Sequence, residues 1–142
     1  MSLKSVMIRN IKVGGGAPVS IQSMTNVDAH DEGLLLSQIS ELENAGCEIV
    51  RLAIPDIEAA NTLKKLRNKT NMPIVADIHF DYKLALAAID AGADKIRINP
   101  GNIGSIERVR AVVNEAKMAH IPIRVGVNSG SLEKDILEKY GK

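Results

Sequence analysis

The chain of 142 residues is 45% hydrophobic and 25% charged, which is the composition of an ordinary soluble globular protein with one core. A formal net charge of +1 and an aromatic content of 2% argue against a general affinity for nucleic acid or for anionic membranes. The single cysteine, Cys47, excludes an internal disulfide and a multi-thiolate metal site within the chain, and it fits a reducing, cytoplasmic setting.

Behind a lead-in strand and loop expected over residues 7–17, five short β-branched runs alternate with amphipathic helical stretches. The runs that we expect to form strands are residues 18–24, 49–54, 73–79, 95–99 and 123–128. The expected helices are residues 32–45, 58–69, 82–91, 106–119 and 132–140. Strands and helices that alternate at a spacing of about 25 residues predict right-handed crossovers and one parallel sheet.

The alternation of side chains along each strand separates two parallel architectures, an open doubly wound sheet and a closed eight-stranded barrel. Strands of an open sheet covered on both faces are almost continuously apolar. Here each strand has one apolar face and one polar face: Val50, Leu52 and Ile54 point one way, and Arg51 points the other. The polar faces have to line a wet or ligand-filled interior, which predicts an α/β fold of the TIM-barrel type. Because a whole barrel takes about 250 residues for eight units, the sequence predicts an incomplete barrel of about five β/α units.

Charged side chains dominate the predicted interior. An unpaired guanidinium is expensive to desolvate, so arginines that point inward need partners. In one interpretation Asp77 and strands missing from the chain supply these partners, as a structural network of ion pairs. In the other, the arginines bind a ligand with several negative charges, because guanidinium forks bind phosphate oxygens bidentately. Three arginines from three separate strands favour the ligand. The charged residues of the predicted interior are Arg51, Asp77, His79, Lys95, Arg97 and Arg124.

The segments that follow the strands are predicted to form the site, because enzymes of this fold carry it at the carboxyl ends of the strands. Residues 79–81, 99–105 and 128–131 occupy these positions. The last two are glycine-rich and open a helix, whose free amides are able to hold an anion. The same residue types also suit ordinary turns, and Ser105 also suits an N-cap. The run Gly14–Gly16 lacks the Lys-Ser/Thr pair of a phosphate loop and is expected to be a flexible turn.

Four longer motifs make the sequence recognisable. They are Gln-Ser-Met-Thr-Asn at 22–26, Ala-Asp-Ile-His-Phe at 76–80, Arg-Ile-Asn-Pro-Gly-Asn-Ile-Gly at 97–104 and Arg-Val-Gly-Val-Asn-Ser-Gly-Ser-Leu at 124–132. In order and spacing they resemble the N-terminal barrel of the GcpE-type 4-hydroxy-3-methylbut-2-en-1-yl diphosphate synthases, the iron–sulfur enzymes of the non-mevalonate route to isoprenoids. The resemblance implies that residues 1–142 are the N-terminal part of the barrel domain, without the C-terminal iron–sulfur domain.

The resemblance implies an oxidoreductase reaction, the reductive dehydration and ring opening of 2-C-methyl-D-erythritol 2,4-cyclodiphosphate to hydroxymethylbutenyl diphosphate. In the family, electrons arrive from ferredoxin or flavodoxin through a [4Fe-4S] cluster in the C-terminal domain, so the cluster ligands are not expected in this chain. That domain of one subunit closes over the barrel of its dimer partner, and a homodimer is therefore expected. The chain alone is expected to bind the diphosphate of the substrate and to be inactive.

The resemblance also implies roles for individual residues of the site. Arg51, Arg97 and Arg124 are expected to bind the diphosphate, in accord with the alternation along the strands. Asn99 and Asn128 are expected to act as neutral donors to the substrate. No metal-binding or cofactor-binding residue is expected within this chain.

Asp77 and His79 are the catalytic candidates, which the resemblance implies orient the sugar part of the substrate or move a proton. The ordinary pKa of histidine, near 6.5, allows proton transfer, but a histidine at the end of a strand equally serves as a hydrogen-bond partner. Gln22, Ser23 and Thr25 are expected to bind the substrate, although Ser23 and Thr25 also suit caps of the following helix.

Three residues outside the motifs are predicted to have no role in the site. Cys47 is expected to be a small buried apolar residue and not a cluster ligand. His30 and His120 are expected on the surface.

Two alternatives to the synthase remain open at this stage. One is another barrel enzyme for phosphorylated or pterin-type substrates, which the arginines alone would allow. The other is a non-catalytic truncated module. Exposed edges of the first and fifth strands are templates for association, so a dimer or larger oligomer is expected. No apolar run reaches the roughly 18 residues of a membrane-spanning helix, so no membrane is expected as a partner.

Overall fold

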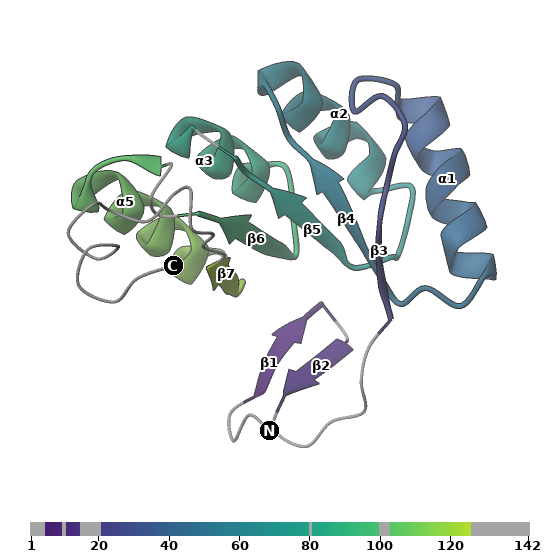
Figure 1. Ribbon diagram of the computed structural model, residues 1–142, viewed down its shortest axis with the longest axis horizontal. Coiled ribbons are helices and arrows are strands. Elements are labelled where there is room, and N and C mark those ends of the chain that lie inside the picture. Colours follow the sequence, from purple (N-terminus) through teal and green to yellow (C-terminus); the bar gives the residue numbers. More distant parts are fainter. Residues whose placement is uncertain (1–4, 10, 15–20, 80, 100–102, 126–142) are drawn as a thin grey trace, which may run out of the picture.

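The computed structural model describes residues 5–9, 11–14, 21–79, 81–99 and 103–125 (Figure 1). Within them, five parallel strands pair in the order in which they occur along the chain. These strands are β3 (Gln22–Met24), β4 (Ile49–Ala53), β5 (Ile74–Asp77), β6 (Lys95–Ile98) and β7 (Ile123–Val125). The helices are α1 (Glu32–Asn44), α2 (Ile57–Arg67), α3 (Tyr82–Asp90) and α5 (Ile106–Met118), and each begins and ends within two residues of its predicted bounds.

The order of the strands is that of a barrel. A doubly wound sheet reverses its strand order at a switch point and carries helices on both faces. Here the order β3-β4-β5-β6-β7 runs without reversal, and the described helices lie along one face of the sheet (Figure 1). The incomplete parallel barrel that the sequence predicts is therefore confirmed.

Side-chain caps place the beginnings of the four helices at one end of the sheet. Asp31, Asp56, Asp81 and Ser105 each accept a hydrogen bond from a backbone amide in the first turn of α1, α2, α3 and α5. These amides have no partner within the helix, so the caps fix where each helix starts. After α3 the chain turns at Gly92, whose φ of 102° is a backbone conformation that residues with a Cβ rarely adopt. Loops between strand and helix therefore gather at the carboxyl ends of the strands.

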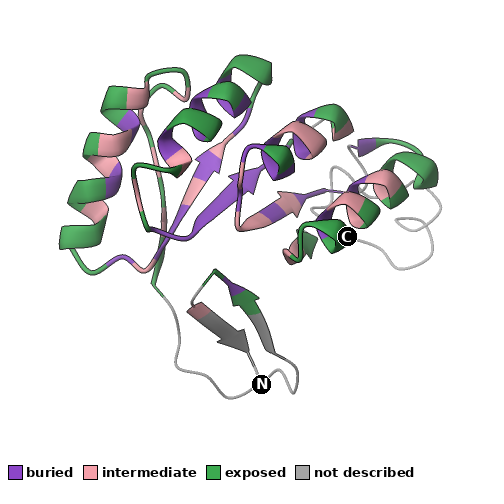
Figure 2. Ribbon diagram, turned by 180° about the vertical axis from the view of Figure 1, so that it is seen from behind, coloured by how far each residue is buried: buried purple, intermediate pink, exposed green. Residues whose placement is uncertain are grey.

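The hydrophobic core lies between the sheet and the helices. Val50, Leu52 and Ile54, along β4 and just beyond it, are at most 2% exposed. They belong to one apolar cluster with buried residues of β5, β6 and all four helices. Figure 2 shows this buried stripe along the strands, while the outer sides of the helices are exposed. The alternation of side chains predicted for β4 is thus confirmed.

The prediction of a single lead-in strand in the first part of residues 7–17 is wrong, and the loop expected at its end, residues 15–17, lies outside the described residues. Instead, β1 (Ser5–Ile8) and β2 (Ile11–Gly14) form an antiparallel hairpin in which Ile8 lies opposite Ile11. Arg9, with a φ of 55°, lies at the tight connection between them. Because no glycine marks this connection, the pattern of residues does not distinguish two short strands from one.

The hairpin closes the amino-terminal end of the barrel interior. Ile8 is 1% exposed and packs with Ile49 and Val75, which lie on the inner face of β4 and β5. The expectation of a polar inner face along every strand is therefore wrong at this end, where the interior is apolar and packed. The polar part of the interior begins further along the strands, at Arg51 and Asp77.

Several predicted features lie outside the described residues. They are the helix at 132–140, the strand residues 18–20 and 126–128, the glycine run at 15–16, and the loop at 128–131 with Asn128.

Candidate functional site

Parallel pairing brings inward residues of neighbouring strands to one level. Ala53 on β4 lies beside Asp77 on β5, Asp77 lies beside Arg97 on β6, and Arg97 lies beside Arg124 on β7. Arg51 precedes Ala53 by two residues and so shares its face of the sheet. The residues Arg51, Asp77, His79, Arg97 and Arg124 are called the Asp77 site below.

The Asp77 carboxylate lies at the centre of this site. It is 2% exposed and meets two guanidinium groups: Nη1 of Arg97 donates to Oδ1 at 3.0 Å, and Nε of Arg51 lies 3.4 Å from Oδ2. The side chains of Arg51 and Arg97 keep 26% and 30% of their surface exposed, so they reach the open part of the interior. One carboxylate between two guanidinium groups leaves a positive charge uncompensated, and the site attracts anions.

Two donors of the site have no acceptor. Nε of Arg51 and Nε of Arg97 are buried and lack a hydrogen-bond partner within the described part of the chain. The distance from Arg51 Nε to Asp77 is that of an ion pair, but its geometry is not that of a hydrogen bond. A buried donor without a partner costs about 1–3 kcal/mol. Both Nε atoms are covered, so an anion with several oxygens would reach the two arginines through the parts of their side chains that stay exposed.

Further positive charge lies next to Arg97. Arg124 occupies the neighbouring register position on β7, and Lys95 precedes Arg97 on the same face of β6. Burial, and then repulsion by Arg124, lowers the pKa of Lys95 from its ordinary value. Because the charged form of this lysine is destabilised, an anion bound close to it would stabilise that form.

His79 lies just beyond β5, where the interior opens. Its Nε2 is 3.6 Å from Oδ2 of Asp77, and its side chain is 54% exposed. Beside it is a cavity of about 420 Å³. The cavity is lined by Ala53, Ile54, Pro55, His79, Asp81 and Leu84. Its mostly carbon-rich wall adjoins the charged Asp77 site, which suits a ligand with one anionic part and one less polar part.

The first motif, residues 22–26, forms the edge of the site next to Arg51, on and just after β3. Met24 lies in register with Arg51 and accepts a hydrogen bond from Arg51 Nη2 at its sulfur, 3.5 Å away. The backbone amide of half-buried Thr25 donates to the carbonyl of Arg51 at 3.1 Å. Gln22 is exposed at the start of β3, on the same face as Met24. Ser23 pairs in register with Val50, so it lies on the helix side of the sheet and is not brought together with Arg51.

Asn99 follows β6 and is 7% exposed. Its backbone carbonyl accepts a hydrogen bond from the amide of Ile103 at 3.2 Å, which fixes the start of the loop after β6. The site residue Asn128 lies outside the described residues.

His30 belongs to this end of the molecule, although the sequence places it only on the surface. Its side chain is 38% exposed, as expected for a surface residue, but both ring nitrogens are engaged. Nδ1 lies 2.7 Å from Asp28 in the β3–α1 loop, and Nε2 lies 2.7 Å from Asp56 at the start of α2. No local pattern reveals this, because Asp56 is 26 residues away and only the pairing of β3 with β4 brings it near. His120 is exposed after α5, as predicted.

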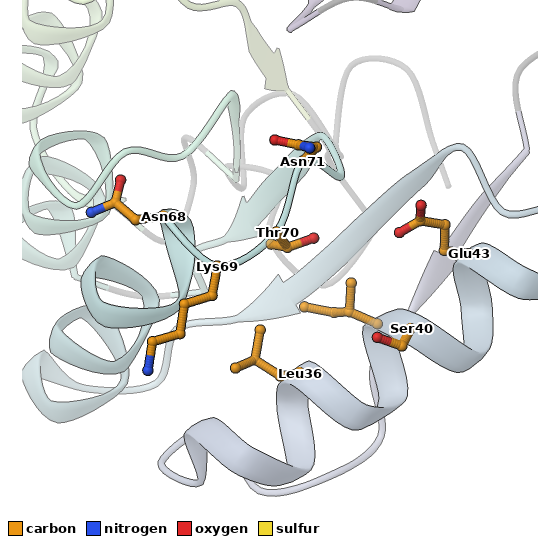
Figure 3. Close-up of a pocket in the computed structure, with 8 residues that line it drawn as sticks. Leu36, Ser40, Glu43, Asn68, Lys69, Thr70 and Asn71 are labelled. Atoms are coloured by element: carbon orange, nitrogen blue, oxygen red, sulfur yellow. The ribbon is translucent and has the colours of Figure 1, made fainter.

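A second cavity, of about 300 Å³, lies on the outside of the barrel (Figure 3). Leu36 and Ser40 of α1 form one side, and Asn68 and Thr70, which follow α2, form the other. It is separated by the sheet from the Asp77 site, and none of the sequence motifs reaches it.

The chain does not fit an iron–sulfur cluster. Such clusters are held by several thiolates, and the sequence has one cysteine, Cys47, which is 8% exposed. Its Sγ donates to the Ile49 carbonyl at 3.0 Å, at the amino-terminal end of β4 and away from the Asp77 site. No group of acidic, histidine and cysteine residues suited to a metal ion occurs among the described residues. None of the helices described is long and apolar enough to cross a membrane.

Comparison with known proteins agrees with the motifs. The GcpE TIM-barrel domain family matches residues 3–142. Three similar relatives, from Caldicellulosiruptor saccharolyticus, Fusobacterium nucleatum and Listeria monocytogenes, are each named 4-hydroxy-3-methylbut-2-en-1-yl diphosphate synthase (flavodoxin). They are 60%, 57% and 57% identical over 96%, 96% and 97% of this chain. The chain spans 40%, 39% and 38% of the length of these relatives.

Proposed function

The chain belongs to the GcpE TIM-barrel domain family, and from this premise we propose that it is the diphosphate-binding part of a 4-hydroxy-3-methylbut-2-en-1-yl diphosphate synthase. The proposed substrate is 2-C-methyl-D-erythritol 2,4-cyclodiphosphate, and the reaction of the whole enzyme is its reductive ring opening in the non-mevalonate pathway. Residues 1–142 are then the N-terminal part of the barrel domain, and a C-terminal iron–sulfur domain completes the enzyme. The proposed setting is the cytoplasm, where the reducing conditions keep a single cysteine as a free thiol.

The observation that carries this proposal is the arrangement around Asp77. Arg51 and Arg97 share one buried carboxylate, and each keeps a buried Nε without an acceptor in the described residues. Guanidinium groups prefer phosphate oxygens, which they bind as forks. A diphosphate would supply acceptors to both arginines and to Arg124 beside them. The purely structural alternative, a closed network of ion pairs, does not account for the excess of positive charge, because one carboxylate faces Arg51 and Arg97 with Arg124 beside them.

The roles of Asp77 and His79 differ in this proposal. Asp77 is a positioning residue, because its two oxygens are already occupied by Arg97 and Arg51 and it is almost fully buried. His79 faces the cavity beside the charged site, where the carbon skeleton of the substrate would lie. The His79 ring, whose Nε2 lies 3.6 Å from Asp77 Oδ2, is proposed to exchange a proton with an oxygen of that skeleton.

Neutral donors complete the proposed site. Asn99, which follows β6, and Asn128, the last residue of the predicted fifth strand, are proposed to bind substrate oxygens. Gln22 and Thr25 of the first motif are proposed to contribute at the other edge, with Thr25 held close by its hydrogen bond to Arg51. Ser23, which lies on the helix side of the sheet, is not part of the proposed site.

Electrons are proposed to arrive from flavodoxin, which the names of the relatives mention, or from ferredoxin. A [4Fe-4S] cluster is proposed to pass them to the substrate, held by residues outside this chain. The chain therefore binds the diphosphate but does not turn over alone.

Titration calorimetry of the 142-residue chain tests the proposal. We expect the cyclodiphosphate to bind with measurable heat, and sulfate and a pterin to bind far more weakly. Arg97→Met removes one fork and is expected to weaken cyclodiphosphate binding at least tenfold, about 1.4 kcal/mol. Arg110→Gln, which removes an exposed arginine from α5, is the matched control and should leave the affinity unchanged. A preference for the pterin, or no binding of any anion, would overturn the proposal.

We also propose that the isolated chain associates with itself. Among the described residues, β3 and β7 are paired on one side only. Val125 on β7 and Ile21 before β3 are each 58% exposed. Unpaired strands with exposed apolar side chains are templates for pairing with another chain. Light scattering at micromolar concentration should give the mass of a dimer or larger, and a monomer would contradict this.

A further inference from the structure

The histidine between Asp28 and Asp56 ties two loops together. His30 and Asp28 belong to the segment between β3 and α1, whereas Asp56 is the N-cap of α2. Nε2 lies 2.9 and 2.7 Å from the two oxygens of Asp56, and Nδ1 lies 2.7 Å from Oδ1 of Asp28. The backbone amide of His30 donates to the same Asp28 oxygen at 2.9 Å. Contacts on both sides of the ring thus join the β3–α1 loop to α2.

This arrangement needs a doubly protonated ring. A neutral imidazole has one N–H and one lone pair, whereas an imidazolium has two donors. Both ring nitrogens of His30 face carboxylate oxygens at hydrogen-bond distance, so a neutral ring would turn a lone pair toward one carboxylate. Hydrogen bonds to Asp56, and then to Asp28, raise the pKa of His30 above its ordinary value of 6.5. The other charged groups near the contact, at the starts of α1 and α2, are Asp31, Glu32 and Glu58, all acidic, and Glu32 is paired with Lys69. The remaining charged residues of the two helices lie toward their far ends, Glu41 and Glu43 on α1 and Lys64, Lys65 and Arg67 on α2.

The loop so held borders the Asp77 site. Its first residue, Thr25, is fixed to the Arg51 carbonyl. Asn26 is fixed to α1, because its amide donates to Oε1 of Gln38 at 2.9 Å. On the other side of the contact, Asp56 directly follows Pro55, which lines the cavity beside His79. His30 is therefore the far anchor of a loop whose near end touches an arginine of the site.

We propose that His30 is a proton-dependent clamp that fastens the β3–α1 loop, residues 25–31, against the start of α2 at the rim of the Asp77 site. With the proton in place, both carboxylates are held and the loop is fixed at both ends. When the proton leaves, one contact becomes repulsive and the far end of the loop is released. The effect of the clamp on ligand affinity rests on the proposed function, whereas its effect on the loop does not.

Nuclear magnetic resonance of the 142-residue chain tests the clamp without any ligand. The His30 ring should titrate above pH 6.5, and the amides of Asn26, Val27 and Ala29 should shift with the same midpoint. Asp56→Asn keeps a good helix cap but removes a carboxylate, so it should bring the His30 midpoint down toward the ordinary value. His30→Arg supplies a permanent cation with a fork that is able to reach two carboxylates, and it should abolish the pH dependence of these amides. His120→Gln is the control and should change neither.

Two results would overturn the clamp: loop amides that do not follow the His30 titration, or a His30 midpoint that Asp56→Asn leaves in place. The affinity for cyclodiphosphate, measured at rising pH in the same proteins, tests the link to the site. The wild-type affinity should fall about two- to fivefold relative to His30→Arg, the size of effect that an exposed ion pair produces. A parallel fall in both proteins would overturn the link. Absence of binding at every pH would refute the proposed function while the amide shifts still decide on the clamp.

Discussion

Arg97 donates from Nη1 to Oδ1 of Asp77 at 3.0 Å, while its own Nε stays buried and without an acceptor in the described residues. The pairing therefore holds the guanidinium in one orientation without using all of its donors. A group that is fixed but not satisfied is prepared for an incoming anion, because little further ordering is needed when the anion binds.

The first prediction concerns the loss of this guanidinium. Arg97→Met leaves Asp77 with Arg51 alone, so the charges of the pair balance and the buried donor disappears. We expect the midpoint of urea unfolding of the free chain to change little. We expect inorganic diphosphate to stabilise the wild-type chain by binding its folded form, and to lose most of that effect in the variant. Arg110→Gln again serves as control, and an unchanged response of Arg97→Met to diphosphate would count against the anion site.

Replacement of the shared carboxylate should lower the stability of the free chain and increase the stabilisation by diphosphate, which Arg97→Met is expected to weaken. Asp77→Asn leaves two partly buried guanidinium groups facing each other without a counter-charge. Removing one partner of a fully buried pair costs about 3–5 kcal/mol, and we expect roughly 2–3 kcal/mol here because the arginines remain partly exposed. Urea unfolding measures this loss. Added inorganic diphosphate should recover more stability in Asp77→Asn than in the wild type, since it replaces the missing charge, and equal recovery in both would refute the reasoning.

The clamp also has a signature in stability. Because the pKa of His30 is raised in the folded chain, its contribution is fully present below about pH 6.5 and is lost as the pH rises through the raised folded value. The pKa of Asp28 is lowered, chiefly by the His30 amide, and that of Asp56 is lowered, chiefly by the Ala59 amide. Their contributions are present above the ordinary value of 3.8 and are lost as the pH falls through the lowered folded values.

His30→Gln should therefore have a lower urea midpoint than the wild type near pH 6. The two midpoints should converge at a pH above the raised pKa of His30, where the wild-type ring is neutral. His120→Gln, at an exposed histidine after α5, should show no such pH-dependent difference. A difference that stays constant with pH would point to lost packing instead of a lost proton.

The residues that carry these predictions were accessible to sequence reasoning to different degrees. Alternation along a strand predicts that Arg51, Asp77 and Arg97 point inward, because that property is local. It does not predict which carboxylate oxygen meets which arginine, since that depends on the register between β4, β5 and β6. The contact of His30 with Asp56 is similarly non-local, and each residue taken separately looks like an ordinary surface group or helix cap.

The end of the barrel interior shows the same limit. Ile49 and Val75 belong to strands whose inner faces become polar two residues later, and their burial depends on a partner from outside the sheet. That partner is Ile8 of the hairpin. The sequence of a four-residue strand such as β1 is too short to predict where the strand packs. The apolar plug that Ile8 forms at this end was therefore not expected, and the predicted polar interior is longer than the observed one.

The hairpin should accordingly contribute to stability through one side chain. Ile8→Ala removes a residue that is 1% exposed and leaves a cavity against Ile49 and Val75, so we expect a loss of about 2–4 kcal/mol in urea unfolding. Met7→Ala is a matched control on the same strand, because Met7 is 51% exposed and should lose less than about 1 kcal/mol. Equal effects of the two substitutions would show that the hairpin is not docked on the sheet.

The last prediction concerns the single thiol. Cys47 is buried, donates its S–H to the Ile49 carbonyl and lies at the end of β4 opposite to the Asp77 site. One buried thiol does not supply the set of thiolates that an iron–sulfur cluster needs. After anaerobic reconstitution with iron and sulfide, the chain should show no iron–sulfur absorbance, and Cys47→Ala should behave in the same way. A stoichiometric cluster that disappears in Cys47→Ala would show that the thiol is reachable and that the chain does more than bind the diphosphate.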